Sequence, residues 1–471
     1  MKSRAAAISL CLMLVLAACG ARLTREQKLA GIGSLAGGSS TATTGSAGDT
    51  TGGAASTTGA TTGSATTTGS AAGGTGSGGP AATACGNPAT NPASDKGVTK
   101  DRIKVMTASD VSGVQAALFK STHQAMSAFA AMINSQGGIC GRVLAVDLKD
   151  TKADSTANSA AVREACDSDF ALVGSMSAFD NGGASAGESC GIPDLTAITV
   201  NGARAKASNV YPIYPIRPDK LAIGTANYIK EKYPDAIKHA AMVYLNAAVT
   251  KQNALQRVKA YEQVGFNFSG RIYEVQVLEP NYSVYVQKMR DAGVEYVDMV
   301  ANYQSIQKLL QAMDQAGWYP KVRDWDSVAY SPNFVTQNGK PFTPANGSLV
   351  FLNTAISEEV SSNPEMQLYS QWLGRVAPGA KPDYFGFYAW SAGRLFAKLA
   401  TQIGAKLTRK AFFDAVKAVH SWNGNGLHAA HDVGNKIMSP CFLYLEIQNG
   451  QFKRKDPASG FACNKGGIVN T

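Results

Sequence analysis

Apolar runs of strand length alternate with stretches of helical periodicity from residue 102 onward. Strands are expected at 102–108, 143–150, 170–176 and 192–200. Between them, 117–136 and 155–166 carry apolar residues at every third or fourth position, as helices do. This alternation predicts right-handed βαβ units that build a parallel sheet.

Three prolines interrupt the pattern within Tyr211–Asp219. Proline fixes φ and biases the preceding residue toward extended backbone, so this segment is expected to connect two bodies. The alternation then restarts, with strands expected at 240–246, 270–277, 296–303 and 325–330. Helices are expected at 221–233, 252–265, 282–293 and 306–317. The chain is therefore predicted to form two similar α/β lobes.

The last part of the chain combines an aromatic helix with a hairpin. Residues 384–404 carry large apolar side chains at helical spacing, which indicates a core-facing stripe rather than a cofactor box. Residues 441–455 contain two strand-like runs around Asn449-Gly450. This dipeptide suits a type I′ turn, so an antiparallel hairpin is expected.

The N-terminus has the composition of a secretory signal. Lys2 and Arg4 precede an apolar run that ends at Leu16, too short to span a bilayer. The following Ala17-Ala18-Cys19 resembles the end of a bacterial lipoprotein cleavage box, in which the cysteine is acylated and becomes the mature N-terminus. The alternative is an ordinary signal peptide with a chance cysteine. We expect residues 1–19 to be a lipoprotein signal and the protein to be extracytoplasmic and lipid-anchored through Cys19.

Residues 20–95 consist almost entirely of Gly, Ala, Ser and Thr, which predicts a disordered tether. The net charge of +10 is nearer +8 without Lys2 and Arg4, and it is scattered along the chain. Its densest cluster, Lys453–Lys455, lacks interleaved aromatic residues. A solvated surface is therefore favoured over a nucleic-acid partner.

Six of the eight cysteines remain once Cys11 in the signal and Cys19 are set aside. An even number in an exported chain indicates disulfides, with fifteen possible pairings. Our preferred pairing is Cys166–Cys190, Cys441–Cys463 and, by elimination, Cys85–Cys140. A zinc site is disfavoured because no pair has CxxC spacing.

Several segments resemble type I solute-binding proteins of the branched-chain amino-acid receptor group. "AMINSQGGICGRVLAVDLKD" (131–150) is similar to the glycine turn between the first helix and second strand of that family. "VYPIYPIRPD" (210–219) is similar to the first crossover between its lobes, and "HAAHDVGNKIMSPCFLYLEIQNGQFKR" (428–454) to its last turn and terminal hairpin. The likeness extends from about Asp101 to Arg454.

This resemblance implies a type I periplasmic-binding-protein fold: two Rossmann-like lobes with parallel sheets, joined by three crossovers. It places lobe 1 at 96–215 plus 353–439 and lobe 2 at 216–352 plus 440–471. It implies a monomeric, non-enzymatic receptor without cofactor that captures a small polar solute, such as an amino acid, amide or organic acid. The solute would pass to an ABC permease, or a membrane signalling partner in the alternative interpretation.

The resemblance also implies a set of ligand-binding residues at strand ends. In the family a serine or threonine holds the ligand carboxylate where this chain has Ala178, beside Ser177. The strand expected at 325–330 places Asp324 and Asp326 before its end, which argues against an α-amino acid ligand. The complete set is Phe119, Ser175, Ser177, Ala178, Phe179, Thr199, Val200, Asn201, Asn246, Tyr303 and Tyr330. For Phe119, Tyr303 and Tyr330 the alternative is a core role, and for Asn246 a helix cap.

Two other motifs are weighed against this interpretation. Gly183–Gly187 matches the G-x-S-x-G pattern of a serine hydrolase around Ser185. That pattern requires a sharp turn directly after a strand, whereas Ser185 lies in a run typical of a helix. His428, His431 and Asp432 have spacing possible for metal ligands, but "HDVGN" is typical of a surface turn. We expect neither catalysis nor a metal site.

Overall fold

The computed structural model describes residues 84–113 and 119–471. The predicted signal, Cys19 and most of the predicted tether lie outside the described residues. Across the part that is described, no helix is both long and apolar enough to cross a membrane.

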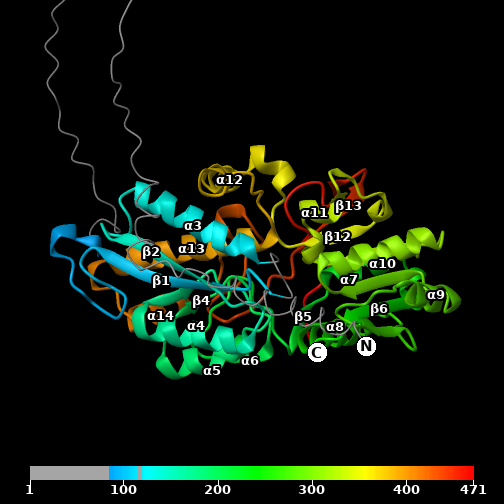
Figure 1. Ribbon diagram of the computed structural model, residues 1–471, viewed down its shortest axis with the longest axis horizontal. Coiled ribbons are helices and arrows are strands. Elements are labelled where there is room, and N and C mark those ends of the chain that lie inside the picture. Colours follow the sequence, from blue (N-terminus) through cyan, green and yellow to red (C-terminus); the bar gives the residue numbers. More distant parts are fainter. Residues whose placement is uncertain (1–83, 114–118) are drawn as a thin grey trace, which may run out of the picture. The chain divides into compact units, whose positions relative to one another are not determined.

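The first sheet has four parallel strands in the order β2-β1-β3-β4. Its strands are β1 (Arg102–Ser109), β2 (Val143–Asp150), β3 (Ala171–Val173) and β4 (Asp194–Leu195). The helices that follow them are α3 (Lys120–Ser135), α4 (Ser155–Ser168), α5 (Asn181–Cys190) and α6 (Gly202–Lys206). Side chains alternate along β1: Val105 packs in the cluster that contains α3, and Met106 in the cluster that contains α4. The two helices therefore cover opposite faces, as Figure 1 shows.

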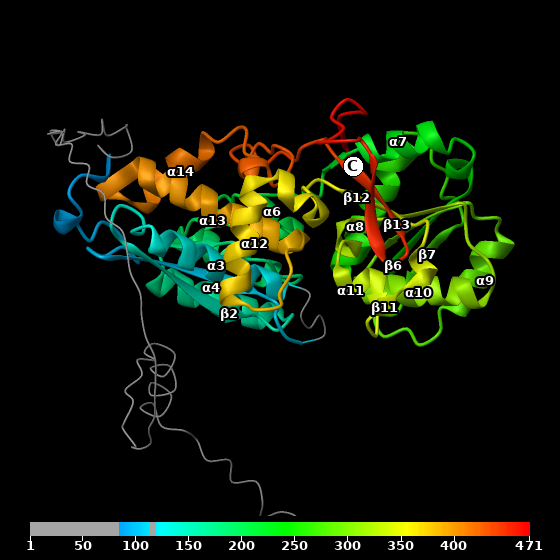
Figure 2. The ribbon, with the colours of Figure 1, turned by 90° about the horizontal axis from the view of Figure 1, so that it is seen from above.

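Three helices from late in the chain complete this first lobe, which we call lobe 1. They are α12 (Pro364–Val376), α13 (Tyr384–Ile403) and α14 (Arg409–Lys417). Orange α13 lies beside cyan α3 in Figure 2 although more than 200 residues separate them. Phe129 of α3 meets Trp390 of α13 edge to face, with ring centroids 5.5 Å apart. The aromatic stripe predicted at 384–404 is thus confirmed as core.

The second sheet has seven strands in the order β14-β13-β12-β9-β8-β6-β7 and forms lobe 2. Its strands are β6 (Ala240–Leu245), β7 (Ile272–Val275), β8 (Tyr296–Val300), β9 (Val322–Trp325), β12 (Leu349–Leu352), β13 (Leu443–Gln448) and β14 (Gln451–Asp456). Its helices are α7 (Gly224–Lys232), α8 (Ala248–Glu262), α9 (Ser283–Asp291), α10 (Tyr303–Gln315) and α11 (Pro332–Val335). Two small ladders pair β5 (Lys220–Ala222) with β15 (Ile468–Asn470) and β10 (Thr336–Gln337) with β11 (Lys340–Pro341). The hairpin β13–β14 is antiparallel, and Asn449 and Gly450 both have positive φ, 49° and 74°, as a type I′ turn requires.

Three segments carry the chain between the lobes. The first leaves lobe 1 at Tyr214, which bridges to Ile198, and reaches lobe 2 through β5. The second runs from the end of β12 to α12, which packs against α3. The third, 438–442, leads into β13. The predicted α/β fold with two lobes is confirmed.

The structure departs from the sequence-based expectation at three places. The strand expected at 325–330 is wrong: β9 ends at Trp325, and 327–329 form a 3₁₀ turn capped by Asp326. β4 covers only two residues of the run expected at 192–200. The ordered chain also begins before residue 96, since Asn91 is buried and its side-chain amide donates to the Cys140 carbonyl.

All three disulfides have the predicted pairing. Cys85–Cys140 joins the entry segment to the glycine turn before β2, and Cys166–Cys190 joins α4 to α5. Cys441–Cys463 ties the third crossover to the C-terminal segment.

Candidate functional site

A cavity with about 1160 Å³ of space between its walls, partly open to solvent, lies between the two lobes. Residues just beyond or at the carboxyl ends of five parallel strands line it: Ala178 after β3, Leu245 on β6, Ala301 after β8, Asp326 after β9 and Phe351 on β12. Ligands of open parallel sheets bind at this edge. The two sheets therefore define one shared site.

The lining is predominantly apolar. It includes Phe119, Met176, Ile198, Ile216, Val249, Val300, Phe385 and Met438. Phe119 meets Phe385 edge to face at 4.9 Å between ring centroids, which gives lobe 1 a rigid aromatic wall. Burying apolar ligand surface against such walls supplies roughly 25 cal/mol per Å².

In lobe 1, the loop after β3 was predicted to donate hydrogen bonds to a ligand, but several of its donors already bond to the protein. Asp110, the residue after β1, is fully buried and accepts from the Ala178 N–H at 2.7 Å and from Ser177 Oγ at 2.9 Å. Ser177 Oγ in turn accepts from the Phe179 N–H. Ser175 Oγ accepts from the Ala108 N–H within the sheet. These donors hold the loop rather than face the cavity unpaired.

The second lobe 1 loop is held in the same manner. Asp180 accepts from the Val200 N–H at 2.9 Å, and from the Asn201 N–H at 3.1 Å and side-chain amide at 2.8 Å. Thr199 is buried, and its hydroxyl donates to the Ile216 carbonyl. Burial raises the pKa of Asp180 to about 6, against the opposing effects of Arg204 and these hydrogen bonds.

On lobe 2, a buried ion-pair cluster reaches the cavity. Arg257 of α8 donates to both carboxylate oxygens of Asp298, at 3.0 and 2.8 Å, and to Asp326 at 3.1 Å. Arg257 and Asp326 both line the cavity, whereas Asp298 is fully buried on β8. Burial opposes the charge of Arg257, but the two carboxylates raise its pKa well above the usual value.

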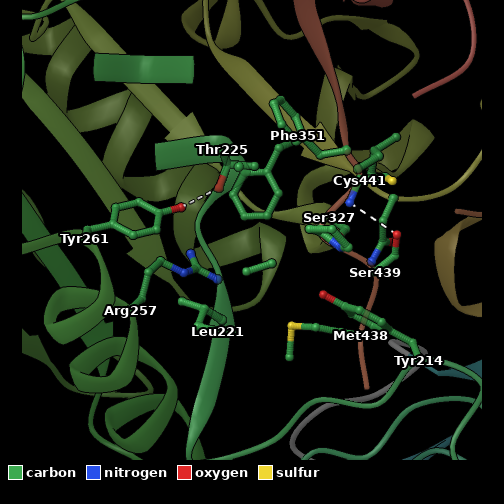
Figure 3. A pocket seen from close by; sticks show the side chains of 16 residues that line it. Tyr214, Leu221, Thr225, Arg257, Tyr261, Ser327, Phe351, Met438, Ser439 and Cys441 are labelled. Atoms are coloured by element: carbon green, nitrogen blue, oxygen red, sulfur yellow. Dashed lines mark hydrogen bonds between the residues drawn. The ribbon is translucent and has the colours of Figure 1, made fainter. Parts of the chain in front are cut away.

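A second, smaller pocket, also partly open to solvent, adjoins the cavity and shares with it Tyr214, Leu221, Arg257, Ser327, Phe351 and Met438. Figure 3 shows Arg257 and Tyr261 extending from α8 on one side, with Tyr214 and Met438 opposite. All three crossovers contribute to its wall, through Tyr214, Asn353 and Ser439 among others. This pocket is therefore located where the lobes are joined.

The predicted ligand-binding residues divide into two groups. Phe119, Ala178 and Val200 line the cavity. The others are not among the lining residues, namely Ser175, Ser177, Phe179, Thr199, Asn201, Asn246, Tyr303 and Tyr330. Tyr330 is buried, and its hydroxyl donates to Glu358 at 2.6 Å, whereas Asn246 is exposed.

Sequence reasoning missed Arg257, Asp326 and Tyr384 in the lining. Asp326 was placed inside a strand that in fact ends one residue earlier. A correct strand end would have put an acid at the cleft. Among the described residues, Arg257 is the Lys or Arg of α8 that pairs with a buried acid. Which basic residue of a helix faces the sheet depends on the rotation of the helix about its axis, and the sequence does not show that rotation.

The two alternative interpretations, a serine nucleophile at Ser185 and a metal site at His428 and His431, lack support in the structure. Ser185 lies exposed in the middle of α5, without the strand-to-helix turn that a nucleophile needs. The described residues hold no group of three or more His, Cys, Asp or Glu side chains able to bind a metal. The surface-turn interpretation of "HDVGN" is wrong for His431, which is buried and stacks on His428 at 5.2 Å.

Both buried histidines have hydrogen bonds that suit a neutral ring. Trp422 Nε1–H donates to Ser391 Oγ, leaving that hydroxyl to donate to His428 Nε2, and His428 Nδ1 lies 2.9 Å from the Ala429 carbonyl. His431 Nδ1 accepts from the Ser439 N–H at 2.8 Å. Burial lowers the pKa of His428 to about 4. These rings are structural.

Two α/β lobes, three crossovers and a cleft at the strand ends define a two-lobed solute-binding protein. The family model described as periplasmic binding protein matches residues 102–451, and the chain belongs to this family. It is a binding protein of a family that works in the periplasm.

Solved structures agree on the fold at low identity. A fatty acid ABC transporter substrate-binding protein from Thermomonospora curvata is 15% identical, with a TM-score of 0.66 over 79% of this chain and 94% of that one. The branched-chain amino acid transporter substrate binding protein from Streptococcus pneumoniae, in complex with isoleucine, is 14% identical, with a TM-score of 0.63 over 76% and 100%. A solute binding protein from R. palustris in complex with 4-hydroxybenzoate is 16% identical, with a TM-score of 0.62 over 75% and 96%. No curated protein sequence matches the chain.

Proposed function

We propose that this protein is a lipid-anchored receptor that encloses a solute with a large apolar body between its lobes and delivers it to an ABC permease. The observation that carries the proposal is the largely apolar cavity at the strand ends of both sheets. It departs from the small polar solute expected from the sequence, because most side chains in the lining are apolar and several of the polar ones, such as Arg257, Asp326 and Gln256, are already paired within the protein.

The solved structures support an apolar body in the ligand. They are a substrate-binding protein of a fatty acid ABC transporter and two binding proteins in complex with isoleucine and with 4-hydroxybenzoate. A fatty acid, isoleucine and 4-hydroxybenzoate each combine an apolar body with a polar end. At 14–16% identity they inform the class of ligand and not its identity.

We propose that Phe119, Ala178 and Val200 contact the ligand directly. Ser177 and Asn201 do not contact the ligand in this proposal. They hold the two loops in place through hydrogen bonds to Asp110 and Asp180. The proposed lobes are 96–215 with 353–439 and 216–352 with 440–471, which agrees with the membership of the two sheets. Ligand would favour closure about the three crossovers.

A thermal-shift screen tests the proposal. Fatty alcohols and acids, aromatic alcohols and acids, and amino acids are added to the purified protein. A true ligand at a hundredfold excess over its Kd should add about 2.7 kcal/mol of stability. Ala178→Trp, which fills the cavity, should abolish the shift, whereas the exposed control Ser185→Ala should retain it. A flat screen would refute the proposal.

The lipid anchor has its own test. Cys19→Ala should move the protein from the membrane fraction to the soluble fraction, because acylation at that thiol supplies the attachment. Cys11→Ala is the matched control and should leave the protein in the membrane fraction. A Cys19→Ala protein that stays with the membrane contradicts the anchor.

A further inference from the structure

The cavity presents few unpaired charged groups to a ligand, although acidic side chains lie at or behind its lining on both lobes. On lobe 1 the loops after β3 and β4 place the side chains of Ala178 and Val200 on the cavity. Their backbone N–H groups donate instead to the carboxylates of Asp110, at 2.7 Å, and Asp180, at 2.9 Å. Both carboxylates are buried.

Each carboxylate uses several donors, so neither loop is loosely held. Asp110 also accepts from Ser177 Oγ, Thr151 Oγ1 and the Ala153 N–H. Asp180 takes both the backbone and side-chain donors of Asn201. A carboxylate with three or more donors is strongly held. The Ala178 and Val200 N–H groups, which lie at the cavity and could meet a ligand anion, are thus already used by the protein itself.

On lobe 2, the cation that lines the cavity is neutralised by carboxylates of the protein. Asp326 lines the cavity directly after β9. Arg257 lies 3.1 Å from the Asp326 carboxylate and donates to both oxygens of Asp298, so two carboxylates match one guanidinium. The Arg257 side chain is 13% exposed and the Asp326 side chain 16%, so the pair is shielded from solvent.

We propose that the cleft selects against an anionic ligand, because Asp110 and Asp180 take the place of a ligand anion on lobe 1 and the charge of Arg257 on lobe 2 is already matched by Asp298 and Asp326. A ligand carboxylate at the lobe 1 loops would lie near two buried carboxylates that already use the N–H groups of Ala178 and Val200. At lobe 2 it would meet a guanidinium that is paired with two carboxylates. Like charges in a shielded site repel strongly, and unpaired charges are costly to desolvate. This inference rests on the proposed solute-binding function and specifies its ligand class.

Matched ligand series test it on the wild-type protein by titration calorimetry. Three carbon frames, n-decyl, benzyl and 3-methylbutyl, are each offered as the alcohol and the carboxylate. In any series that binds, the alcohol should bind at least tenfold more tightly than the carboxylate. A carboxylate that binds as tightly as its alcohol overturns this inference alone. Absence of binding in every series refutes the proposed function, and this inference with it.

Asp326→Asn sharpens the test with little change in shape. The asparagine oxygen can still cap the turn by accepting from the Val328 N–H, but the negative charge beside Arg257 is lost. One carboxylate, that of Asp298, then matches Arg257 instead of two, so the affinity for decanoate should rise at least tenfold relative to decanol. Asp414→Asn, which removes an exposed charge far along the chain on α14, is the control and should leave the ratio unchanged. An unchanged ratio in folded Asp326→Asn contradicts the inference.

Discussion

Near the cleft, the two lobes satisfy their buried carboxyl groups in different ways. At the lobe 1 side of the cleft, Asp110 and Asp180 are met mainly by backbone N–H groups and short side chains of nearby loops. In lobe 2, Asp298 is met by Arg257 from a helix, and Asp324 by the hydroxyls of two tyrosines. Around the cleft, lobe 1 thus depends on backbone turns, whereas lobe 2 depends on long side chains. The two should fail under different substitutions.

The largest effect is expected for Arg257→Ala. Removing the guanidinium leaves Asp298 buried without its cation, which typically costs about 3–5 kcal/mol of unfolding free energy. Lys410→Ala, which breaks an exposed pair with Asp414, should cost under about 0.5 kcal/mol. Urea unfolding of both variants measures the difference. Equal losses would show that the lobe 2 cluster is not a stabilising element.

Acid should weaken the histidine cluster of lobe 1. The folded pKa of His428 is lowered from 6.5 to about 4 by burial, so its contribution is present above pH 6.5 and is lost as pH falls toward 4. The loss over that window is about 3 kcal/mol. Asp180, with a pKa raised to about 6, responds in the opposite sense.

The test for His428 is therefore a difference between proteins. Wild type and His428→Gln are unfolded in urea from pH 7 to pH 4, and the variant should lose less stability than the wild type over this range. Parallel curves would mean that His428 is not the titrating group.

Gly174→Ala tests the backbone turns of lobe 1. Gly174 has φ +67°, and a Cβ would lie 2.8 Å from Met126 and 3.3 Å from the Ala389 carbonyl. Left-handed backbone costs about 1–2 kcal/mol in any residue with a Cβ, and the close packing adds to it. Gly191→Ala, with φ +65° and open space, carries the backbone cost alone. The excess loss in Gly174→Ala, about 1 kcal/mol, should appear in thermal unfolding, and equal losses would exclude the packing effect.

Tyr330→Phe is expected to have the smallest effect. Its hydroxyl donates to Glu358 and accepts from the Ser357 N–H at 2.7 Å, so its removal should cost about 1 kcal/mol of stability. Ligand affinity should stay unchanged, because Tyr330 does not line the cavity. A loss of affinity without a loss of stability would restore the ligand-contact role expected from the sequence.

Much of the fold follows from local pattern. Helical periodicity at 384–404 and the Asn449-Gly450 turn depend on residues that are neighbours in sequence, and the structure confirms both. The end of β9 was misplaced because Ser327 to Tyr330 has apolar residues spaced as in a strand, although Asp326 caps a turn there.

The site was less predictable because its contacts join distant segments. Asp110 and Ala178 are 68 residues apart, and Arg257 and Asp326 are 69 apart. No local pattern shows which carboxylate accepts from which loop. The predicted strand ends do indicate the edge of the sheets at which the cavity lies. Of the predicted ligand-binding residues, Phe119, Ala178 and Val200 line this cavity.

The ring of Tyr388, on α13, lies at the junction of all three crossovers. It stacks on Tyr214 of the first at 5.4 Å, its hydroxyl donates to Asn353 of the second at 2.8 Å, and His431 beside it accepts from Ser439 of the third. The three linkers thus share one anchorage on lobe 1. If lobe 2 swings against lobe 1, the linkers would bend between this anchorage and the second sheet, beside the cavity that Tyr214 and Met438 line.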